Sequence, residues 1–252
     1  MSRATTKTSK RLPYIKKAAS SANPALRELY LIMEEKESNT VFCASFSTKA
    51  ELLEHVRQVA KSACMIRIHI DMVVDFDIHL LIELQELSRK HRFLLFEDRK
   101  FAESAPFASE QYDKGIYKIA YWAHFVSAVP FYSTVEAIRS LGLQMGRGCL
   151  LYTPPTDYAS FQQAQELIAQ YKDFAVGALS SSLRTPLPDS FSLKEGVVLD
   201  ENDYRLESTT PEKTIAQGFD AFIVPHTLLK EDKEAAAENI RLRGWKSHKE
   251  RI

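Results

Sequence analysis

Short apolar runs of β-prone residues alternate with amphipathic helical patterns along most of the chain, and this alternation is the strongest constraint on the fold. Their continuous apolar character is typical of strands buried on both faces of a parallel sheet. The eight runs are Val41–Ser45, Met65–Ile70, Phe93–Phe96, Phe125–Val129, Cys149–Tyr152, Phe174–Leu179, Gly196–Leu199 and Ala221–Val224.

Helical patterns precede the first of these runs, separate most of the others and follow the last. In Pro24–Lys36 the apolar residues recur at helical spacing, and Pro24 suits a first helical turn. The other patterns are Lys49–Lys61, Asp77–Lys90, Thr134–Leu143, Asp157–Tyr171, Pro211–Gln217 and Leu228–Arg243. Strand–helix units repeated about eight times predict an α/β protein, a (β/α)₈ TIM barrel, and the 252 residues match the ~250 typical of this fold. A doubly wound open sheet is the alternative, but no G-x-G-x-x-G or P-loop follows the first run.

The expected domain organisation is an N-terminal tail at residues 1–23 followed by one barrel at residues 24–252. The tail is basic, and its Ser and Thr content favours a solvated segment resting on the first helix over a nucleic-acid-binding arm. The longest loop-like stretch, residues 180–195, is rich in Ser and Pro and fits either a lid or a plain insertion.

Composition excludes several classes of protein. Lys+Arg and Asp+Glu balance at 33 each, so no global charge favours nucleic acid. No run of 18 apolar residues predicts a membrane span, and the N-terminus lacks the apolar core of a signal peptide. Cys43, Cys64 and Cys149 lie in apolar stretches without metal-ligand spacing. They indicate reduced thiols in a cytoplasmic protein with no metal site.

The segment 94–103, LLFEDRKFAE, is the most informative for chemistry. A buried apolar run leads directly into charged residues, and strand alternation places Asp98 and Lys100 on one side with Arg99 on the other. Such a pair at the carboxyl end of a barrel strand lies where barrel enzymes do their chemistry. The alternative is a structural ion pair.

One run earlier, Met65–Asp71 reads MIRIHID, and alternation predicts that Arg67, His69 and Asp71 share one side. A buried Arg needs a neighbouring anion, and Asp98 on the next strand is a suitable one. His69 taken alone fits a hydrogen-bonded core residue better than a catalyst.

Together these residues resemble the orotidine 5′-phosphate decarboxylase family. FEDRKFA is similar to its D-x-K-x-x-D signature, and the order and spacing of the other matches hold across nearly the whole chain. Those matches are CAS at Cys43–Ser45, H-x-D at His69–Asp71, QYDKGIYKIAYWA at Gln111–Ala123, GVVLD at Gly196–Asp200 and RLRGW at Arg241–Trp245.

The resemblance implies a (β/α)₈ barrel, no cofactor and no metal. It gives Lys100 the role of proton donor to the carbon that loses carbon dioxide, and Asp98 that of its charged partner. Arg67 stands where the family has a Lys, and Glu103 stands at the last acid of the signature, which reaches into the partner subunit's site. The resemblance therefore also implies a homodimer with its active sites near the interface.

For substrate binding, the resemblance puts Ser45 and Thr156 at polar positions facing the pyrimidine ring, with His69 and Asp71 in the matching H-x-D stretch. His226 stands at the family's phosphate-holding position.

The positions that hold the nucleotide in the family are altered. Ser47 aligns with an Asp that holds ribose hydroxyls, a Thr of the family aligns near Phe107 with Pro106 beside it, and Pro225 with His226 stands at the Gly-Arg pair that grips phosphate. Pro has no N–H to offer, and a neutral imidazole does not replace a bidentate guanidinium. Binding energy from such remote groups lowers the barrier at the reacting centre. Efficient decarboxylation of orotidine 5′-phosphate is therefore not expected.

Four functions remain open. The leading hypothesis is a cofactor-independent carboxy-lyase acting on a non-nucleotide carboxylic acid, such as a β-keto or vinylogous acid of specialised metabolism. The others are genuine orotidine 5′-phosphate decarboxylase, a non-decarboxylating isomerase or cyclase using the same acid–base pair, and a catalytically silent barrel. Aromatic residues expected near the mouth, among them Phe46 and Tyr152, suit a larger apolar substrate.

Overall fold

The computed structural model describes residues 12–102, 104–181, 189–199, 209–229 and 232–252. Eight parallel strands close into a barrel in the order of the sequence, from β1 to β8. The strands are β1 Thr40–Ala44, β2 Met65–Ile68, β3 Leu94–Phe101, β4 Phe125–Ala128, β5 Gly148–Thr153, β6 Ala175–Ser180, β7 Phe191–Lys194 and β8 Ala221–Val224. The predicted (β/α)₈ TIM barrel is confirmed.

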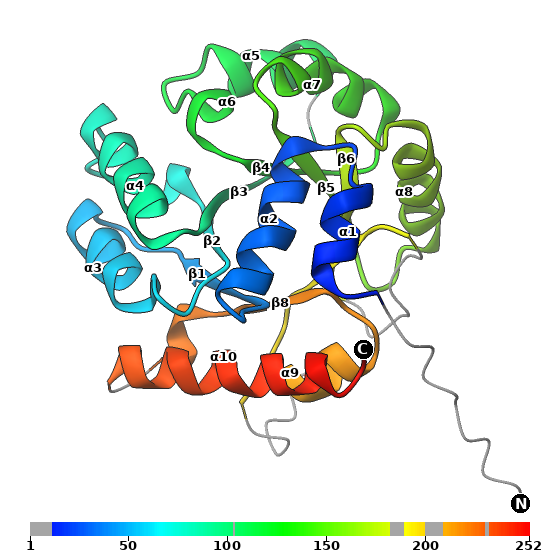
Figure 1. The fold of residues 1–252 in the computed structure, drawn as a ribbon. Coiled ribbons are helices and arrows are strands. Elements are labelled where there is room, and N and C mark those ends of the chain that lie inside the picture. The colour runs from blue at the N-terminus through cyan, green and yellow to red at the C-terminus, as the bar shows by residue number, and fades with distance from the viewer. Residues whose placement is uncertain (1–11, 103, 182–188, 200–208, 230–231) are drawn as a thin grey trace, which may run out of the picture.

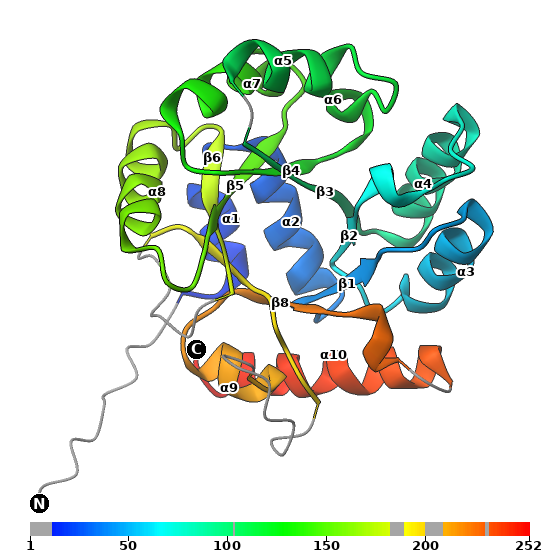
Figure 2. The ribbon, with the colours of Figure 1, turned by 180° about the vertical axis from the view of Figure 1, so that it is seen from behind.

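The first two helices lie across one end of the barrel, and the later ones surround its outer side (Figures 1 and 2). The helices are α1 Tyr14–Ser20, α2 Pro24–Glu35, α3 Lys49–Val59, α4 Ile78–His91, α5 Ala105–Asp113, α6 Ile119–Trp122, α7 Tyr132–Gln144, α8 Tyr158–Gln170, α9 Pro211–Ala216 and α10 Lys233–Lys249, with 3₁₀ turns η1 Ile70–Met72 and η2 His226–Leu228. None of these helices is both long and apolar enough to cross a bilayer, as far as the structure describes the chain.

Local sequence sets where the main helices begin. The Asn23 side chain accepts a hydrogen bond from the Leu26 N–H, with Pro24 in the first turn of α2. Thr48 and Asp77 cap α3 and α4 in the same manner, and Asp157 caps α8. The side chains that satisfy free N–H groups thus fix the point where each strand–helix loop ends.

Two apolar cores build the fold. One lies between the strands and the outer helices. The other fills the barrel and continues into α1 and α2, which lie across one end of it (Figure 1). There Tyr14 and Tyr30 stack with ring centroids 5.8 Å apart, and Tyr30 meets Phe191 edge-on. This end is closed, so the opposite end, at the carboxyl termini of the strands, is left for a site.

The seventh strand differs from the prediction. It is Phe191–Lys194, inside the stretch 180–195 that was expected to be a loop, whereas Gly196–Leu199 only forms a bridge between Val197 and Thr209. The expected strand at Gly196–Leu199 is therefore wrong. The sequence FSLK alternates apolar and polar residues, and a search for continuous apolar runs passes over it. Lys194 is nevertheless buried, because its ammonium donates to the carbonyl oxygens of Ser181 and Glu195.

α1 lies within residues 1–23, the range expected to be a tail. Its Tyr14 is buried and donates a hydrogen bond to the Asp220 carbonyl oxygen, and its ring stacks on His248 at 4.1 Å. Lys17 pairs with the buried Asp220 carboxylate. Residues 14–20 therefore contribute to the closed end of the barrel.

Candidate active site

The site lies at the carboxyl ends of the strands and continues the side-chain layers of the barrel interior. Val41 and Cys43 of β1, Met65 of β2 and Leu94 and Phe96 of β3 belong to the inner core. Because successive side chains of a strand point to opposite faces, every second residue after these also points into the barrel, up to its mouth. The polar side chains that meet there are those of Ser45, Arg67, His69, Asp98, Lys100, Ser127 and Glu195.

Asp98 is the centre of this cluster, and its side chain is fully buried. Its Oδ1 accepts a hydrogen bond from Ser127 Oγ at 2.6 Å. Its Oδ2 faces three nitrogens: Arg67 Nη1 at 3.2 Å, His69 Nε2 at 3.4 Å and Lys100 Nζ at 3.4 Å. Burial alone would raise the pKa of Asp98, but the bond from His69 and the charges of Arg67 and Lys100 outweigh it. The pKa stays well below its usual range, so Asp98 is an anion.

Lys100 is held in an uncommon backbone conformation. Its φ is 49°, in the left-handed region, and the register between β3 and β4 shifts at this point. The Lys100 N–H donates to Ser127 Oγ at 2.8 Å, and Nζ lies 4.5 Å from the centre of the Tyr152 ring. Non-Gly residues with positive φ cluster at functional sites. The result is an ammonium placed between a carboxylate and an aromatic face, with 35% of the side chain exposed toward the mouth.

Ser45, His69 and Asp98 form a chain that resembles a hydrolase triad. Ser45 Oγ lies 2.7 Å from His69 Nδ1, and His69 Nε2 lies 3.4 Å from Asp98 Oδ2. Burial lowers the pKa of His69, but the hydrogen bond to Asp98 outweighs this and raises it to about 9. The imidazole is thus protonated at neutral pH and cannot take the Ser45 proton. The chain instead places a positive charge at the mouth of the barrel, with both imidazolium N–H groups directed at Ser45 and Asp98.

Arg67 is the second cation fixed inside the mouth. Besides Asp98, its Nη1 donates to Glu195 Oε2 at 2.9 Å. Glu195 follows β7 directly and shares the inner face with Phe191 and Leu193. The sequence pattern does not single out Glu195, because the apolar run expected for the seventh strand, Gly196–Leu199, begins after it. Alternation from the correct strand, FSLKE, would have predicted its direction.

Cys43 also lies in this cluster rather than in an inert core position. Its Sγ is 3.1 Å from Ser45 Oγ and 3.5 Å from Arg67 Nη2. Burial raises the pKa of this thiol, but hydrogen bonds from His226 and His69 and the Arg67 charge outweigh burial and lower it to about 5. Cys64 shows the contrast, because burial raises its pKa to about 12.

Three further predicted residues lie apart from Asp98. Asp71 does not share the face of Arg67 and His69, because η1 begins at Ile70 and ends the strand alternation; Asp71 pairs with Arg99 instead. Thr156 is exposed in the turn between β5 and α8. His226 opens η2, and its ring lies 4.7 Å from that of Phe46.

Glu103 lies outside the described residues. Among the residues that are described, no three His, Cys, Asp or Glu side chains are grouped so that they could hold a metal ion.

Glu97, next to Asp98, points to the opposite face of β3. It is completely buried and accepts a hydrogen bond from the Ile70 N–H at 3.1 Å. Burial raises its pKa to about 8. This hydrogen bond fixes the start of η1 directly after His69, so Glu97 stabilises the backbone next to His69 from the opposite face of β3.

The fold and these contacts define an acid–base enzyme built in a (β/α)₈ barrel, with a preorganised carboxylate–ammonium pair at the mouth. The model of the "Orotidine 5′-phosphate decarboxylase / HUMPS family" matches residues 41–240. The chain belongs to this family, and its relatives with decarboxylase names are carboxy-lyases, so the chain is an enzyme of the lyase class.

Individual relatives agree with the family match. The chain is 34% identical to orotidine 5′-phosphate decarboxylase of Schizosaccharomyces pombe, over 95% of this chain and 96% of that protein. It is 33% identical to the enzyme of the same name from Phycomyces blakesleeanus, over 95% of each chain. It is 29% identical to uridine 5′-monophosphate synthase of Bos taurus, over 91% of this chain and 50% of that protein.

Proposed function

We propose that the chain decarboxylates orotidine 5′-phosphate without a cofactor, with Lys100 as the proton donor and Asp98 as its charged partner. The observation that carries this proposal is the placement of Lys100 Nζ 3.4 Å from the buried Asp98 Oδ2 at the mouth of the barrel. The names of relatives that align over nearly the whole chain support the nucleotide as substrate. They support it better than the non-nucleotide acid expected from the sequence.

In the proposed reaction the bond between the ring carbon and the carboxylate breaks, and its electron pair stays on the carbon as carbon dioxide leaves. The Lys100 ammonium stabilises the developing carbanion and then gives it a proton, and the neutral amine regains a proton from solvent. Asp98 pairs with this ammonium, since its Oδ2 lies 3.4 Å from Nζ, and so fixes the position from which the proton is given. The buried Asp98 carboxylate and the incoming substrate carboxylate repel each other, and loss of carbon dioxide relieves this repulsion.

A homodimer is part of this proposal. Apolar side chains are exposed on the loops and helices that follow β2, β3 and β4, at the same end as the site. The largest exposures are those of Val74, Phe107 and Ile116 at 82%, 65% and 72%. A contiguous exposed apolar surface is typical of protein–protein contacts, and we expect these side chains to contribute to one at the dimer interface. Glu103 would then reach the partner's site, and the enzyme would work in the cytoplasm.

A non-nucleotide carboxylic acid is the second candidate substrate, and the phosphate position favours it. Pro225 offers no N–H there, and the His226 ring packs on Phe46 and bonds to Cys43. Ser47, at the ribose position, is exposed. A β-keto acid, whose carbanion is delocalised, needs less binding energy from remote groups.

One assay separates the two substrates. Purified protein is given orotidine 5′-phosphate and, separately, a β-keto acid, and carbon dioxide and products are measured together. Formation of uridine 5′-monophosphate, and growth of a uridine-requiring strain that carries the gene, are the expected results. Carbon dioxide from the β-keto acid alone would favour the second candidate. A product of unchanged mass would overturn decarboxylation itself.

A further inference from the structure

Glu195 and Arg67 come from separate parts of the barrel and meet inside its mouth. Arg67 belongs to β2, whereas Glu195 follows β7, and Arg67 Nη1 lies 2.9 Å from Glu195 Oε2. The same Nη1 lies 3.2 Å from Asp98 Oδ2. The side chains of Arg67 and Glu195 are only 13% and 17% exposed. Two protein carboxylates therefore already contact this guanidinium in a largely buried position.

The position of Glu195 is fixed by its backbone. The Glu195 N–H donates to the Ser180 carbonyl oxygen at 2.9 Å, which ties the residue to the end of β6. The ammonium of Lys194 donates to the Ser181 carbonyl oxygen at 2.8 Å and also to the Glu195 carbonyl oxygen. Since both sides of its peptide unit are held, Glu195 reaches Arg67 from a preorganised backbone and not from a free loop.

The other donors of Arg67 do not offer a second carboxylate position among the described residues. Nη2 faces Cys43 Sγ at 3.5 Å, and Nε is buried without a hydrogen-bond partner. A guanidinium binds a carboxylate best through two parallel N–H groups. An incoming carboxylate at Arg67 would have to displace Glu195, or stand beside it and suffer like-charge repulsion.

We propose that Glu195 is a specificity-determining residue, an internal carboxylate that occupies the anion position on Arg67. The substrate then presents its carboxylate to Lys100 and a neutral group, such as a carbonyl or amide, to Arg67. The part of this inference that concerns Lys100 rests on the proposed decarboxylation. The part that concerns Arg67 rests only on the contacts of Glu195.

Acetate is the probe for the Arg67 part, because it is the smallest carboxylate able to replace that of Glu195. Glu195→Ala removes the internal carboxylate and leaves space for the probe. Melting temperatures are measured in sodium acetate and in sodium chloride of equal ionic strength. We expect acetate to stabilise Glu195→Ala specifically, with an affinity at least about tenfold above any in the wild type, since a charge-assisted hydrogen bond contributes that much.

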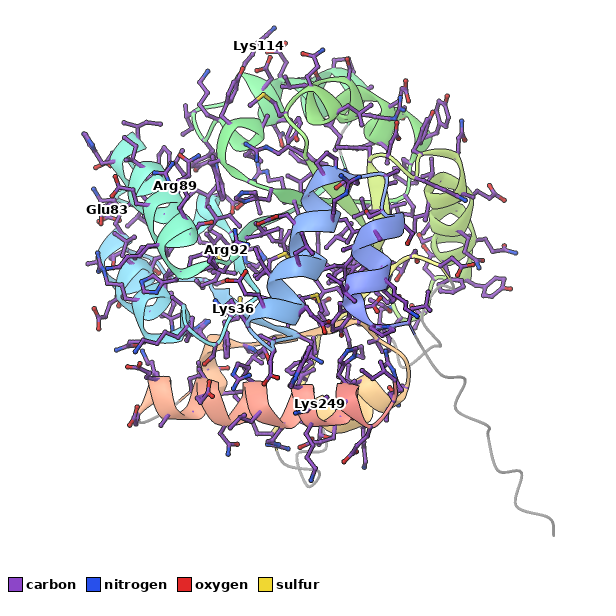
Figure 3. The ribbon with its side chains drawn as sticks, in the orientation of Figure 1. Lys36, Glu83, Arg89, Arg92, Lys114 and Lys249 are labelled. Atoms are coloured by element: carbon purple, nitrogen blue, oxygen red, sulfur yellow. The ribbon has the colours of Figure 1, made fainter. Side chains whose placement is uncertain are left out.

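The matched control is Glu83→Gln. Glu83 lies on the outer surface of α4, away from the barrel axis, and its side chain is 47% exposed beside Arg57 (Figure 3). This variant should respond to acetate as the wild type does. Adding Arg67→Met to Glu195→Ala should abolish the acetate effect, because the cation that holds the probe is gone.

Two results would overturn the inference: an acetate response of Glu195→Ala equal to that of Glu83→Gln, or a response that survives Arg67→Met. If Glu195→Ala does not fold, Glu195→Ser also removes the carboxylate, leaves space for acetate and decides by the same comparison. Decarboxylation of orotidine 5′-phosphate is measured on the same preparations. If the wild type is inactive, this result contradicts the proposed function, and the acetate measurement still tests the role of Glu195.

Discussion

Replacing Asp98 with Asn removes the negative charge on which Arg67, His69 and Lys100 converge. Because these cations are partly buried, the loss leaves charge without compensation in a low-dielectric environment. Removing one partner of a buried ion pair costs about 3–5 kcal/mol. We expect the free energy of unfolding of Asp98→Asn, from urea titration at pH 7, to fall by about this amount.

The pH dependence of the free energy of unfolding tests the role of Asp98 in a second way. The pKa of His69 is raised to about 9 from its usual 6.5, so its contribution is fully present below pH 6.5 and is lost as the pH rises through about 9. A shift of this size corresponds to on the order of 3 kcal/mol. The contribution of His69 should therefore be lost between pH 6.5 and 9, and it is measured as the difference in stability between the wild type and Asp98→Asn, because Cys43 and Glu97 titrate in both proteins. Asp98→Asn should lack most of this contribution, because the imidazolium no longer has its anion.

Asp71→Asn is the matched control, since Asp71 pairs with Arg99 at a half-exposed position. An exposed pair contributes about 0–1 kcal/mol, so this variant should stay close to the wild type. The reasoning fails if Asp98→Asn is no less stable than Asp71→Asn, or if the difference in stability between the wild type and Asp98→Asn is the same at pH 6.5 and at pH 9.

Three further outcomes are expected. Lys100→Met should lower kcat by at least about 10³-fold, because both charge stabilisation and general acid catalysis are lost, while the urea midpoint changes little. A fall in kcat accompanied by a fall in the urea midpoint would indicate a structural role for Lys100. Iodoacetamide at pH 6.5 should alkylate Cys43 before the other two cysteines, because the pKa of Cys43 is lowered to about 5. Peptide mass mapping measures the order of labelling, and equal labelling of the three cysteines would contradict a Cys43 thiolate. Gly177→Ala should prevent stable folding, since an added Cβ would lie 1.9 Å from the Phe191 carbonyl oxygen, and a wild-type melting temperature would refute this contact.

The parts of the site that the sequence could predict are those that depend on alternation within one strand. Asp98 with Lys100, and Arg67 with His69, follow from the period of two in β3 and β2. Asp71 does not follow this alternation, because the 3₁₀ turn η1 begins at Ile70. No Gly or Pro in the sequence indicates that the strand ends there.

Other parts depend on contacts between distant segments. The surroundings of Cys43 combine β1, β2 and η2, so its lowered pKa cannot be read from the apolar residues beside it in the sequence. Glu195 was missed for a related reason. The burial of Lys194 in β7 depends on carbonyl oxygens at Ser181 and Glu195, and without them FSLK does not have the pattern of a core strand.

The fold itself was more predictable than the site. Eight strand–helix units leave few closed parallel arrangements, so one misplaced strand did not change the predicted architecture. The N-terminal helix was less visible, because YIKKAAS is short and its stability comes from Tyr14 packing against Tyr30 and His248.

The most direct test of the central claim is the formation of uridine 5′-monophosphate from orotidine 5′-phosphate by the purified wild type and by Lys100→Met. The wild type should form one nucleotide for each carbon dioxide released, and the variant should be slower by at least about 10³-fold. A wild type that forms no nucleotide product would contradict the proposed substrate. A Lys100→Met variant as fast as the wild type would contradict the proposed proton donor.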